Sequence, residues 1–553
     1  MANNLVAPLP LEDGQVLVEL EDAIKRTVWD NRDSMLPKDK REYLEAFLME
    51  HESVKHALEV EEEKSNAADG VWNSVKRHIK IHLGDFFDQL AGTSTGGLLA
   101  LYFASEGGKE RYTVPKDFLP ALEGAPDGKP SAAEHHLWDG AGSQEPRGSA
   151  TGAVALYLSQ ADTIFPGQLL PFANVVRAGI NSDHAMHGKE GLERVLKGAF
   201  GEPQDVSALK LSDAKHDVAV SAVDLSSGRS AFFYRSKALG NKAPSPQPHG
   251  GTAAAAHWGL ALNLRRSVNN AAANKGKVLV RRAPGGLETA AAGGGPAPSK
   301  GLGLGRLEEV DQGDEAVQAA SWIAPVELHH MDFPMFMVAR ATSAAPGFLP
   351  YIAIKCGDED KERTFVDGGL ANNNPTWVGL TAMLAKYEDN ALETTAILSL
   401  GTGTAWAGED QMDLDLRKMV ILAMNANGED KENILDMLYN GILRRPAGQL
   451  LRVQLSADAR RPEFDLELDT DEVAALSTMD DSKQDLLKRY IKLGKLLAER
   501  NRDRLRWWVE CFIFGLKDPA TAHMPPLRVN SEAVKAASRP MVEVTMAEGP
   551  AGH

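Results

Sequence analysis

The chain has 553 residues, 43% of them hydrophobic, and a formal net charge of −17 at pH 7. It can therefore bury one large core with insertions, and its acidic balance argues against nucleic acid as a partner. Two cysteines are too few for a disulfide framework and indicate a reducing compartment. The start lacks a signal-peptide pattern, and no apolar run reaches the ~18 residues of a transmembrane helix. We expect a cytoplasmic protein whose membrane contacts, if any, are peripheral.

In chain order, the first predicted element is an amphipathic helix around residues 17–28. Residues 30–66 are rich in Glu and Lys, which predicts one or two charged surface helices inserted after it. A short buried strand is then predicted over residues 86–91. An apolar helix is predicted over residues 98–104. A turn of small residues joins the two.

This turn, Gly-Thr-Ser-Thr-Gly-Gly at residues 92–97, has the G-x-S-x-G form of a nucleophile elbow. Small residues around Ser94 permit a sharp turn and leave its hydroxyl exposed at a helix N-terminus. There the unpaired N–H groups favour developing negative charge, and the backbone N–H of Thr95 is the candidate oxyanion donor. The alternative is an ordinary glycine-rich turn without chemistry. The flanking strand and helix favour the elbow.

A serine nucleophile needs a base, and the histidines of this chain are poorly placed to supply one. In α/β-hydrolases the triad follows the chain order Ser, Asp, His. No histidine lies between Asp367 and Lys517, and only His523 and His553 follow. The earlier histidines are in the wrong order for that fold. A Ser–His–Asp hydrolase is therefore the weaker interpretation.

A carboxylate can replace the histidine, and Asp367 is the candidate. Residues 364–366 are predicted to end a strand, and the Asp-Gly-Gly turn that follows would release the aspartate into a site. Residues 372–375, Asn-Asn-Asn-Pro, then provide capping chemistry for a helix. Alone, Asp-Gly-Gly is an ordinary turn. Its occurrence together with the serine elbow predicts that Asp367 accepts the Ser94 proton.

Further elements are predicted along the chain. The last helix has an apolar core face. The adjacent Trp507 and Trp508 in it are expected to be buried in packing or to form a partner surface rather than to contact lipid. Helices are predicted over residues 189–200, 413–443 and 481–514, and strands over residues 218–222 and 232–234.

Taken together, the motifs resemble those of the patatin-like phospholipases, serine acyl hydrolases that use a Ser–Asp dyad. The family's elbow is similar to residues 92–97, and its Asp-Gly-Gly turn with a following Asn-Asn-Pro is similar to residues 367–375. Residues 340–346 and 398–403 resemble two further family segments. The resemblance implies that Ser94 is the nucleophile and that Asp367 is the proton acceptor. The glycines of the elbow and turn motifs are Gly92, Gly96, Gly97, Gly368 and Gly369.

The resemblance also implies a fold and an activity. The fold is a three-layer α/β/α architecture with a central, mostly parallel sheet. The activity is that of a phospholipase A-type serine esterase, which cleaves fatty-acyl esters of phospholipids or related acyl-lipids through an acyl-enzyme, with no metal and no cofactor. We expect the acyl hydrolase domain over residues 11–515, with the charged insertion at 30–66, a disordered low-complexity insertion at 237–316 and a flexible tail at 519–553.

One family feature is missing. Patatin-like enzymes carry an Asp-Gly-Gly-Gly-x-Arg-Gly loop near the N-terminus, whose N–H groups form the oxyanion hole. Residues 10–14, Pro-Leu-Glu-Asp-Gly, stand in its place. Loss of one oxyanion donor typically costs about 10²–10³ in kcat. Two interpretations stay open: an incomplete or mis-spliced version of an active enzyme, or a catalytically impaired member that binds lipid or a protein partner.

The low-complexity insertion contains the one basic stretch of this acidic chain. Residues 257–282 include six Arg and Lys residues and no Asp or Glu. The favoured interpretation is a solvated, disordered insertion, because its alternating leucines fit no helical stripe. The alternative is contact with an anionic membrane, which would gain about 1 kcal/mol per basic residue, with Trp258 as an interfacial anchor.

Overall fold

The computed structural model divides into two compact units, one of residues Met1–Gln247 with Leu328–His553 and one of Pro248–Glu327. In the second unit, the described residues form one antiparallel pair, β4 (Val278–Val280) with β5 (Glu308–Val310). Most of the predicted charged and low-complexity insertions, including Trp258, lie outside the described residues. The structure describes residues 11–31, 79, 81–123, 144–165, 188–235, 278–280, 308–310, 332–356, 361–387, 391–404, 416–456 and 483–528.

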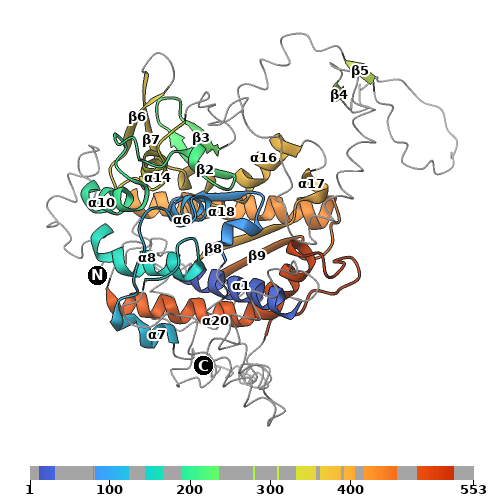
Figure 1. The fold of residues 1–553 in the computed structure, drawn as a ribbon. Coiled ribbons are helices and arrows are strands. Elements are labelled where there is room, and N and C mark those ends of the chain that lie inside the picture. The colour runs from blue at the N-terminus through green and yellow to red at the C-terminus, as the bar shows by residue number, and fades with distance from the viewer. Residues whose placement is uncertain are drawn as a thin grey trace, which may run out of the picture. The chain divides into compact units, whose positions relative to one another are not determined.

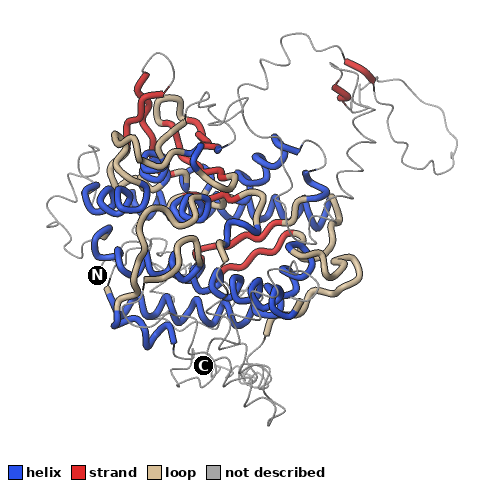
Figure 2. Tube along the Cα trace, viewed as in Figure 1, coloured by secondary structure: helices blue, strands red, loops and turns tan. Residues whose placement is uncertain are grey.

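The larger unit contains both helices and strands (Figure 1), which Figure 2 colours by type. Its α-helices are α1 (Leu11–Asp30), α6 (Thr95–Ala104), α7 (Leu119–Glu123), α8 (Ala150–Ile164), α10 (Lys189–Phe200), α14 (Met335–Thr342), α15 (Gly369–Asn372), α16 (Thr376–Tyr387), α17 (Ala391–Thr394), α18 (Leu416–Asp436) and α20 (Gln484–Trp508). Its strands are β1 (Leu90–Thr93), β2 (Val218–Asp224), β3 (Arg229–Tyr234), β6 (Ile352–Cys356), β7 (Lys361–Asp367), β8 (Ile397–Thr404) and β9 (Leu450–Ser456). Short 3₁₀ helices are η1 (Leu83–Phe86), η2 (Lys116–Phe118) and η4 (Leu211–Asp213), and π-helical turns are η7 (Met437–Ile442) and η8 (Val509–Ile513).

Five described strands form one mixed sheet in the order β1-β2-β7-β6, with β3 also paired to β2. β1 and β2 run parallel, whereas the pairs β2–β3, β2–β7 and β6–β7 are antiparallel. A mostly parallel sheet, as the resemblance implies, is therefore wrong for these strands. The short connections between β2 and β3 and between β6 and β7 explain two of the three antiparallel pairs, because connections of this length permit only hairpins. β8 and β9 form a separate parallel pair.

Helix α16 packs between the sheet and the end of α18. Val378 of α16 is fully buried against Ala219 and Phe232 of the sheet. Leu380 contacts the other side, where Leu435 and Tyr439 are buried. Burial of an apolar side chain of this size contributes roughly 1.5–3 kcal/mol. These contacts hold the first turns of α16, the helix that follows the aspartate turn and α15, in place.

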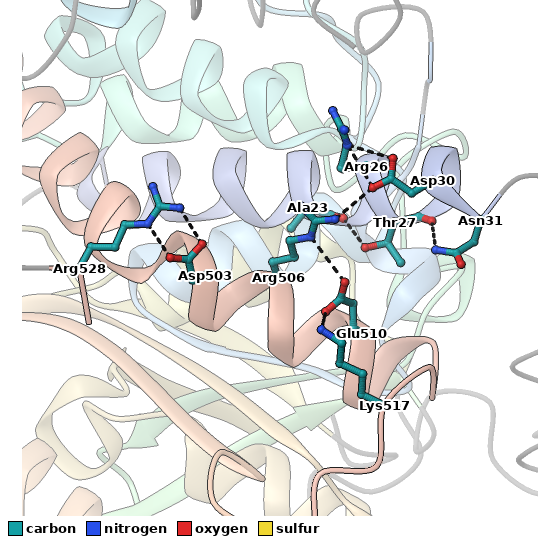
Figure 3. Close-up of polar contacts among 10 residues, drawn as sticks. All are labelled: Ala23, Arg26, Thr27, Asp30, Asn31, Asp503, Arg506, Glu510, Lys517 and Arg528. Atoms are coloured by element: carbon teal, nitrogen blue, oxygen red, sulfur yellow. Dashed lines mark hydrogen bonds and ion pairs between the residues drawn. The ribbon is translucent and has the colours of Figure 1, made fainter. Parts of the chain in front are cut away.

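Helices α1 and α20 lie side by side in Figure 1. Both helices bury apolar residues, among them Leu20 and Leu505. Polar pairs at the edge, shown in Figure 3, include Arg506 with Asp30 at 3.0 Å. Because this pair is partly exposed, it contributes at most about 1 kcal/mol. The apolar faces therefore provide most of the stability of this helix pair.

Residues beyond the last helix also contact α20. Arg528 binds Asp503 through two nitrogen–oxygen contacts of 2.6 Å each (Figure 3). The backbone N–H of Arg528 donates to the carbonyl of Arg500 at 3.1 Å. Arg528, the tenth residue of the predicted tail, is thus bound to α20. Residues 529–553 lie outside the described part.

Most predicted elements occupy their expected positions. The predicted helices over 189–200 and 481–514 correspond to α10 and to α20 with η8, and Trp507 and Trp508 are each only 3% exposed. The predicted strand over 86–91 is wrong at its start, since β1 begins at Leu90.

The reason for this shift is an aromatic contact. Phe86 and Phe87 instead contact Phe514 and Trp508, at ring-centroid distances of 6.0 and 6.2 Å. Their apolar character therefore serves packing against the C-terminal helix rather than strand pairing. In the described parts of the chain, no helix combines the length and apolar character needed to cross a bilayer.

Candidate active site

Ser94 lies where the chain turns from β1 into α6. Its φ of 55° and ψ of −127° fall in a region that residues with a side chain rarely adopt. Such strain costs on the order of 1–3 kcal/mol and persists only where the surroundings impose it. The backbone N–H of Ser94 donates to the hydroxyl of Thr342 at 2.9 Å, which fixes the turn from outside. A strained serine at a strand-to-helix turn is the geometry of a nucleophile elbow.

The elbow glycines differ in the space around them. A β-carbon on Gly92 would collide with the carbonyl of Gly96, because strand and helix approach closely there. On Gly97 it would lie 2.8 Å from Cγ2 of Thr342. On Gly96 it would meet no atom within 4 Å. Close approach therefore requires glycine at positions 92 and 97 but not at 96.

Strand β2 brings the two candidate catalytic residues together. Thr93, which precedes Ser94, lies opposite Ser221 in the parallel pair β1–β2. Asp367, at the end of β7, lies opposite Ala222 in the antiparallel pair β2–β7. Ser221 and Ala222, which are adjacent in β2, thus pair with the last residue of β1 and the last residue of β7. This register places the elbow beside the aspartate turn.

A buried chain of hydroxyl groups reinforces this register. The Thr93 hydroxyl donates to the carbonyl of Asn372 at 2.7 Å and lies 2.6 Å from the Ser221 hydroxyl. Since its single proton is used on Asn372, the Ser221 hydroxyl is the donor to Thr93. A β-carbon on Gly368 would collide with Ser221. The elbow strand, β2 and the aspartate turn are therefore tied at one point.

The Asp367 carboxylate is fully buried at this point. Its Oδ1 accepts a hydrogen bond of 2.7 Å from the backbone N–H of Gly369, and its own N–H donates to the carbonyl of Ala344 at 3.0 Å. Burial raises the pKa of Asp367 to about 7, although contacts with the Ser94 side chain and the Gly369 N–H lower it. A base with a pKa near neutrality suits proton transfer at physiological pH.

The contact between Ser94 and Asp367 is looser than a full hydrogen bond. The Ser94 side chain lies close enough to lower the pKa of Asp367. Nevertheless, Oδ2 of Asp367 makes no hydrogen bond of ordinary geometry within the described residues. Hydrogen bonds between catalytic groups are often long before substrate binds, and they tighten in the Michaelis complex. The arrangement therefore allows the carboxylate to accept the serine proton.

Lys431 of α18 binds the residues that follow the aspartate turn. Its Nζ donates to the carbonyl of Ala371 and to Oδ1 of Asn372, the latter at 2.8 Å. A third contact reaches Oδ1 of Asn427 at 3.3 Å. Burial lowers the pKa of Lys431. No motif pointed to this lysine, nor to Ser221, whereas Thr342 lies in the segment 340–346 that resembles the family.

The start of the elbow helix offers candidate oxyanion donors. The first N–H groups of a helix have no acceptor within it, and in α6 these belong to Thr95 and Gly96. Leu11 to Gly14, in the place of the family's glycine loop, belong to α1 and not to a loop. A β-carbon on Gly14 would lie 2.6 Å from Val154, so this glycine serves helix packing. Residues 1–10, which precede α1, lie outside the described part.

A strained serine beside a group that can accept its proton is an arrangement that can activate the hydroxyl as a nucleophile. Among known proteins, this chain is 30% identical to Patatin-like protein 4 of Arabidopsis thaliana over 182 residues, which cover 30% of the chain and 44% of that protein. It is 37% identical to the Probable inactive patatin-like protein 9 of the same plant over 76 residues, or 13% of the chain and 20% of that protein. It is 35% identical to Patatin-like protein 6 of Arabidopsis thaliana over 82 residues, which cover 14% of the chain and 16% of that protein.

These matches support membership of the patatin-like family for this chain. The chain matches less than half the length of each of these curated relatives. No protein-family model matches it.

Proposed function

We propose that the chain is a lipid acyl hydrolase that uses Ser94 as nucleophile and Asp367 as proton acceptor. The observation that carries this proposal is the strained Ser94 at the N-terminus of α6, within interaction range of a buried carboxylate. The partial likeness to patatin-like proteins 4 and 6 supports the substrate class, which is phospholipids or related acyl-lipids. A three-layer α/β/α architecture, as the family resemblance implies, is part of the same proposal.

The proposed reaction has two steps. Asp367 accepts the hydroxyl proton of Ser94 while the serine oxygen attacks the ester carbonyl. It then passes this proton to the alcohol portion of the lipid as the ester bond breaks, and is again a carboxylate. Water then attacks the acyl-enzyme while Asp367 accepts its proton. Asp367 returns this proton to the Ser94 oxygen as the fatty acid is released. The N–H groups of Thr95 and Gly96 at the start of α6 would stabilise the oxyanion, as unpaired helix N–H groups favour negative charge.

Hydrolysis of a short-chain p-nitrophenyl ester and of phosphatidylcholine vesicles tests the proposal. Ser94→Ala and Asp367→Asn should each lower kcat by about 10⁴-fold or more, and the double variant should be little worse than either. The exposed Ser207→Ala and Asp205→Asn are the matched controls and should retain full activity. Activity that survives Ser94→Ala in purified protein would contradict the assignment.

A second candidate is a catalytically impaired protein that binds lipid or a protein partner. The missing glycine loop favours it, and so does the likeness to a relative named as probably inactive. In this case the chain hydrolyses activated esters slowly. A family-type glycine loop inserted before Leu11 should then raise kcat by about 10²-fold or more. Turnover of the unmodified chain within the usual range for enzymes, roughly 1–10³ s⁻¹, would exclude this candidate.

A further inference from the structure

A second group of chemically active side chains lies at the opposite end of the elbow strand from Ser94. Asp85 belongs to η1 before β1, Glu106 follows α6, and His216 precedes β2. Since β1 and β2 are parallel, their N-terminal ends lie at the same edge of the sheet. One ligand atom of each residue lies within 4.8 Å of the others. In the described part of the chain, this is the one group of three metal-competent side chains found.

The imidazole of His216 is the informative member of this group. His216 is only 8% exposed, and its Nε2 is buried without a hydrogen-bond partner among the described residues. Nε2 nevertheless lies 3.2 Å from Oδ1 of Asp85. The two groups are thus close enough for an ion pair but are not oriented as donor and acceptor. A buried polar nitrogen in this condition is unfavourable unless something else satisfies it.

A shared cation accounts for this geometry. Two ligand atoms at about 2.1 Å from one metal ion are separated by roughly 3–3.5 Å and point at the ion rather than at each other. The 3.2 Å separation of Nε2 and Oδ1 falls in this range. The side chain of Asp85 is 51% exposed, which leaves a path from solvent to the group.

The surrounding backbone holds the imidazole in place. A β-carbon on Gly84 would lie 2.5 Å from Cδ2 of His216, so the ring rests directly on this glycine. The backbone N–H groups of Lys215 and His216 both approach the carbonyl of Ala104, at 2.7 and 3.4 Å. The end of the elbow helix and the start of β2 are therefore already joined, and the ring has little freedom to turn away.

We propose that Asp85, Glu106 and His216 bind a divalent transition-metal ion. One imidazole and two carboxylates form a mixed nitrogen and oxygen donor set, which suits Zn²⁺ or Mn²⁺ better than Ca²⁺, whose ligands are all oxygens. Water completes the coordination. The ion joins the segment before β1, the end of α6 and the start of β2, so its role is to stabilise the base of the elbow and not to take part in ester cleavage.

The test is metal binding by the full-length chain after chelator treatment and dialysis. Isothermal titration with Zn²⁺, Mn²⁺ and Ca²⁺ should show a site that prefers Zn²⁺ or Mn²⁺. The midpoint temperature of thermal unfolding, Tm, should rise by a few degrees at saturating Zn²⁺. Asp85→Asn, Glu106→Gln and His216→Gln should each weaken Zn²⁺ affinity at least about tenfold. The exposed Asp205→Asn is the control and should bind as the wild type does.

The variants also separate the proposal from a simple His–Asp ion pair. An ion pair needs Asp85 and His216 but not Glu106, and it gives no response of the Tm to Zn²⁺. Asp85 is exposed enough for its amide variant to fold, and circular dichroism of the metal-free protein checks this. Loss of the Zn²⁺ response in Glu106→Gln supports the site. Equal Zn²⁺ binding by the wild type and all three variants, or no Zn²⁺ binding at all, would overturn it.

Discussion

The backbone N–H of Ser94 donates to the side-chain hydroxyl of Thr342 at 2.9 Å, so the end of α14 holds the elbow in its strained conformation. The same threonine is fully buried, and its methyl group limits the space at Gly97. One side chain therefore both satisfies the N–H of the serine and packs against the helix that follows. The position of the Ser94 hydroxyl depends on a residue 248 positions away in the sequence.

Thr342→Val keeps the shape of the side chain but removes this acceptor. We expect a loss of about 1–3 kcal/mol in the free energy of unfolding, because the Ser94 N–H is left without a partner. The kcat for ester hydrolysis should fall roughly 10- to 100-fold with little change in KM, since the nucleophile is less well oriented. Thr342→Ser, which retains the hydroxyl, should keep most of the activity. Equal losses in both variants would show that packing, not the hydrogen bond, matters.

The raised pKa of Asp367 predicts the pH dependence of activity. The carboxylate must be ionised to accept a proton, and its pKa in the folded protein is about 7. The value of kcat/KM should therefore rise with pH and reach half its maximum near pH 7, because this parameter reports the free enzyme. A profile measured with a neutral ester checks this. Full activity at pH 5 would contradict a base with this pKa.

The same shift predicts that Asp367→Asn stabilises the protein while it abolishes activity. The folded-state pKa lies above the unfolded value of about 3.9, so ionisation favours the unfolded chain as the pH rises from about 4 to about 7. The uncharged amide escapes this penalty. At pH 8 the variant should gain up to about 4 kcal/mol in unfolding free energy, and the gain should shrink toward pH 4. Denaturant unfolding at several pH values measures it, and a variant less stable at pH 8 would be contrary to the account.

The space around the elbow glycines predicts opposite outcomes for two neighbouring substitutions. Gly92→Ala places a methyl group against the carbonyl of Gly96, so the chain must shift and ester hydrolysis should be lost. Gly96→Ala meets open space in the first turn of α6 and should be neutral or stabilising by up to about 1 kcal/mol. Tm and activity of the two purified variants provide the comparison. Equal losses of Tm and activity in Gly92→Ala and Gly96→Ala would contradict the open space described at Gly96.

The sequence predicted the elbow and the aspartate turn because both are local patterns of small residues at fixed spacing. It did not predict the groups that hold them. Ser221, Thr342 and Lys431 lie far from the motifs they support, and only the pairing of β1 and β7 with β2 brings the first of these to the site. Local patterns contain no information on such pairings.

Three other features that the sequence did not predict have the same origin. The family resemblance implies a mostly parallel sheet, whereas the short connections between β2 and β3 and between β6 and β7 make these two pairs antiparallel. Phe86 and Phe87 have the composition of a strand, but their partners are Phe514 and Trp508. Asp85, Glu106 and His216 share no short motif, so sequence spacing gave no sign of a metal site. Each of these features depends on contacts between distant segments.

The most direct measurement of the central proposal is covalent labelling of the purified chain with a fluorophosphonate probe, followed by peptide mass spectrometry. The proposal predicts a single labelled serine, Ser94, with labelling abolished in Ser94→Ala and slowed in Asp367→Asn. The probe needs an activated serine but no lipid recognition, so the result does not depend on the choice of substrate. An unlabelled chain, or a label on a different serine, would contradict Ser94 as the nucleophile.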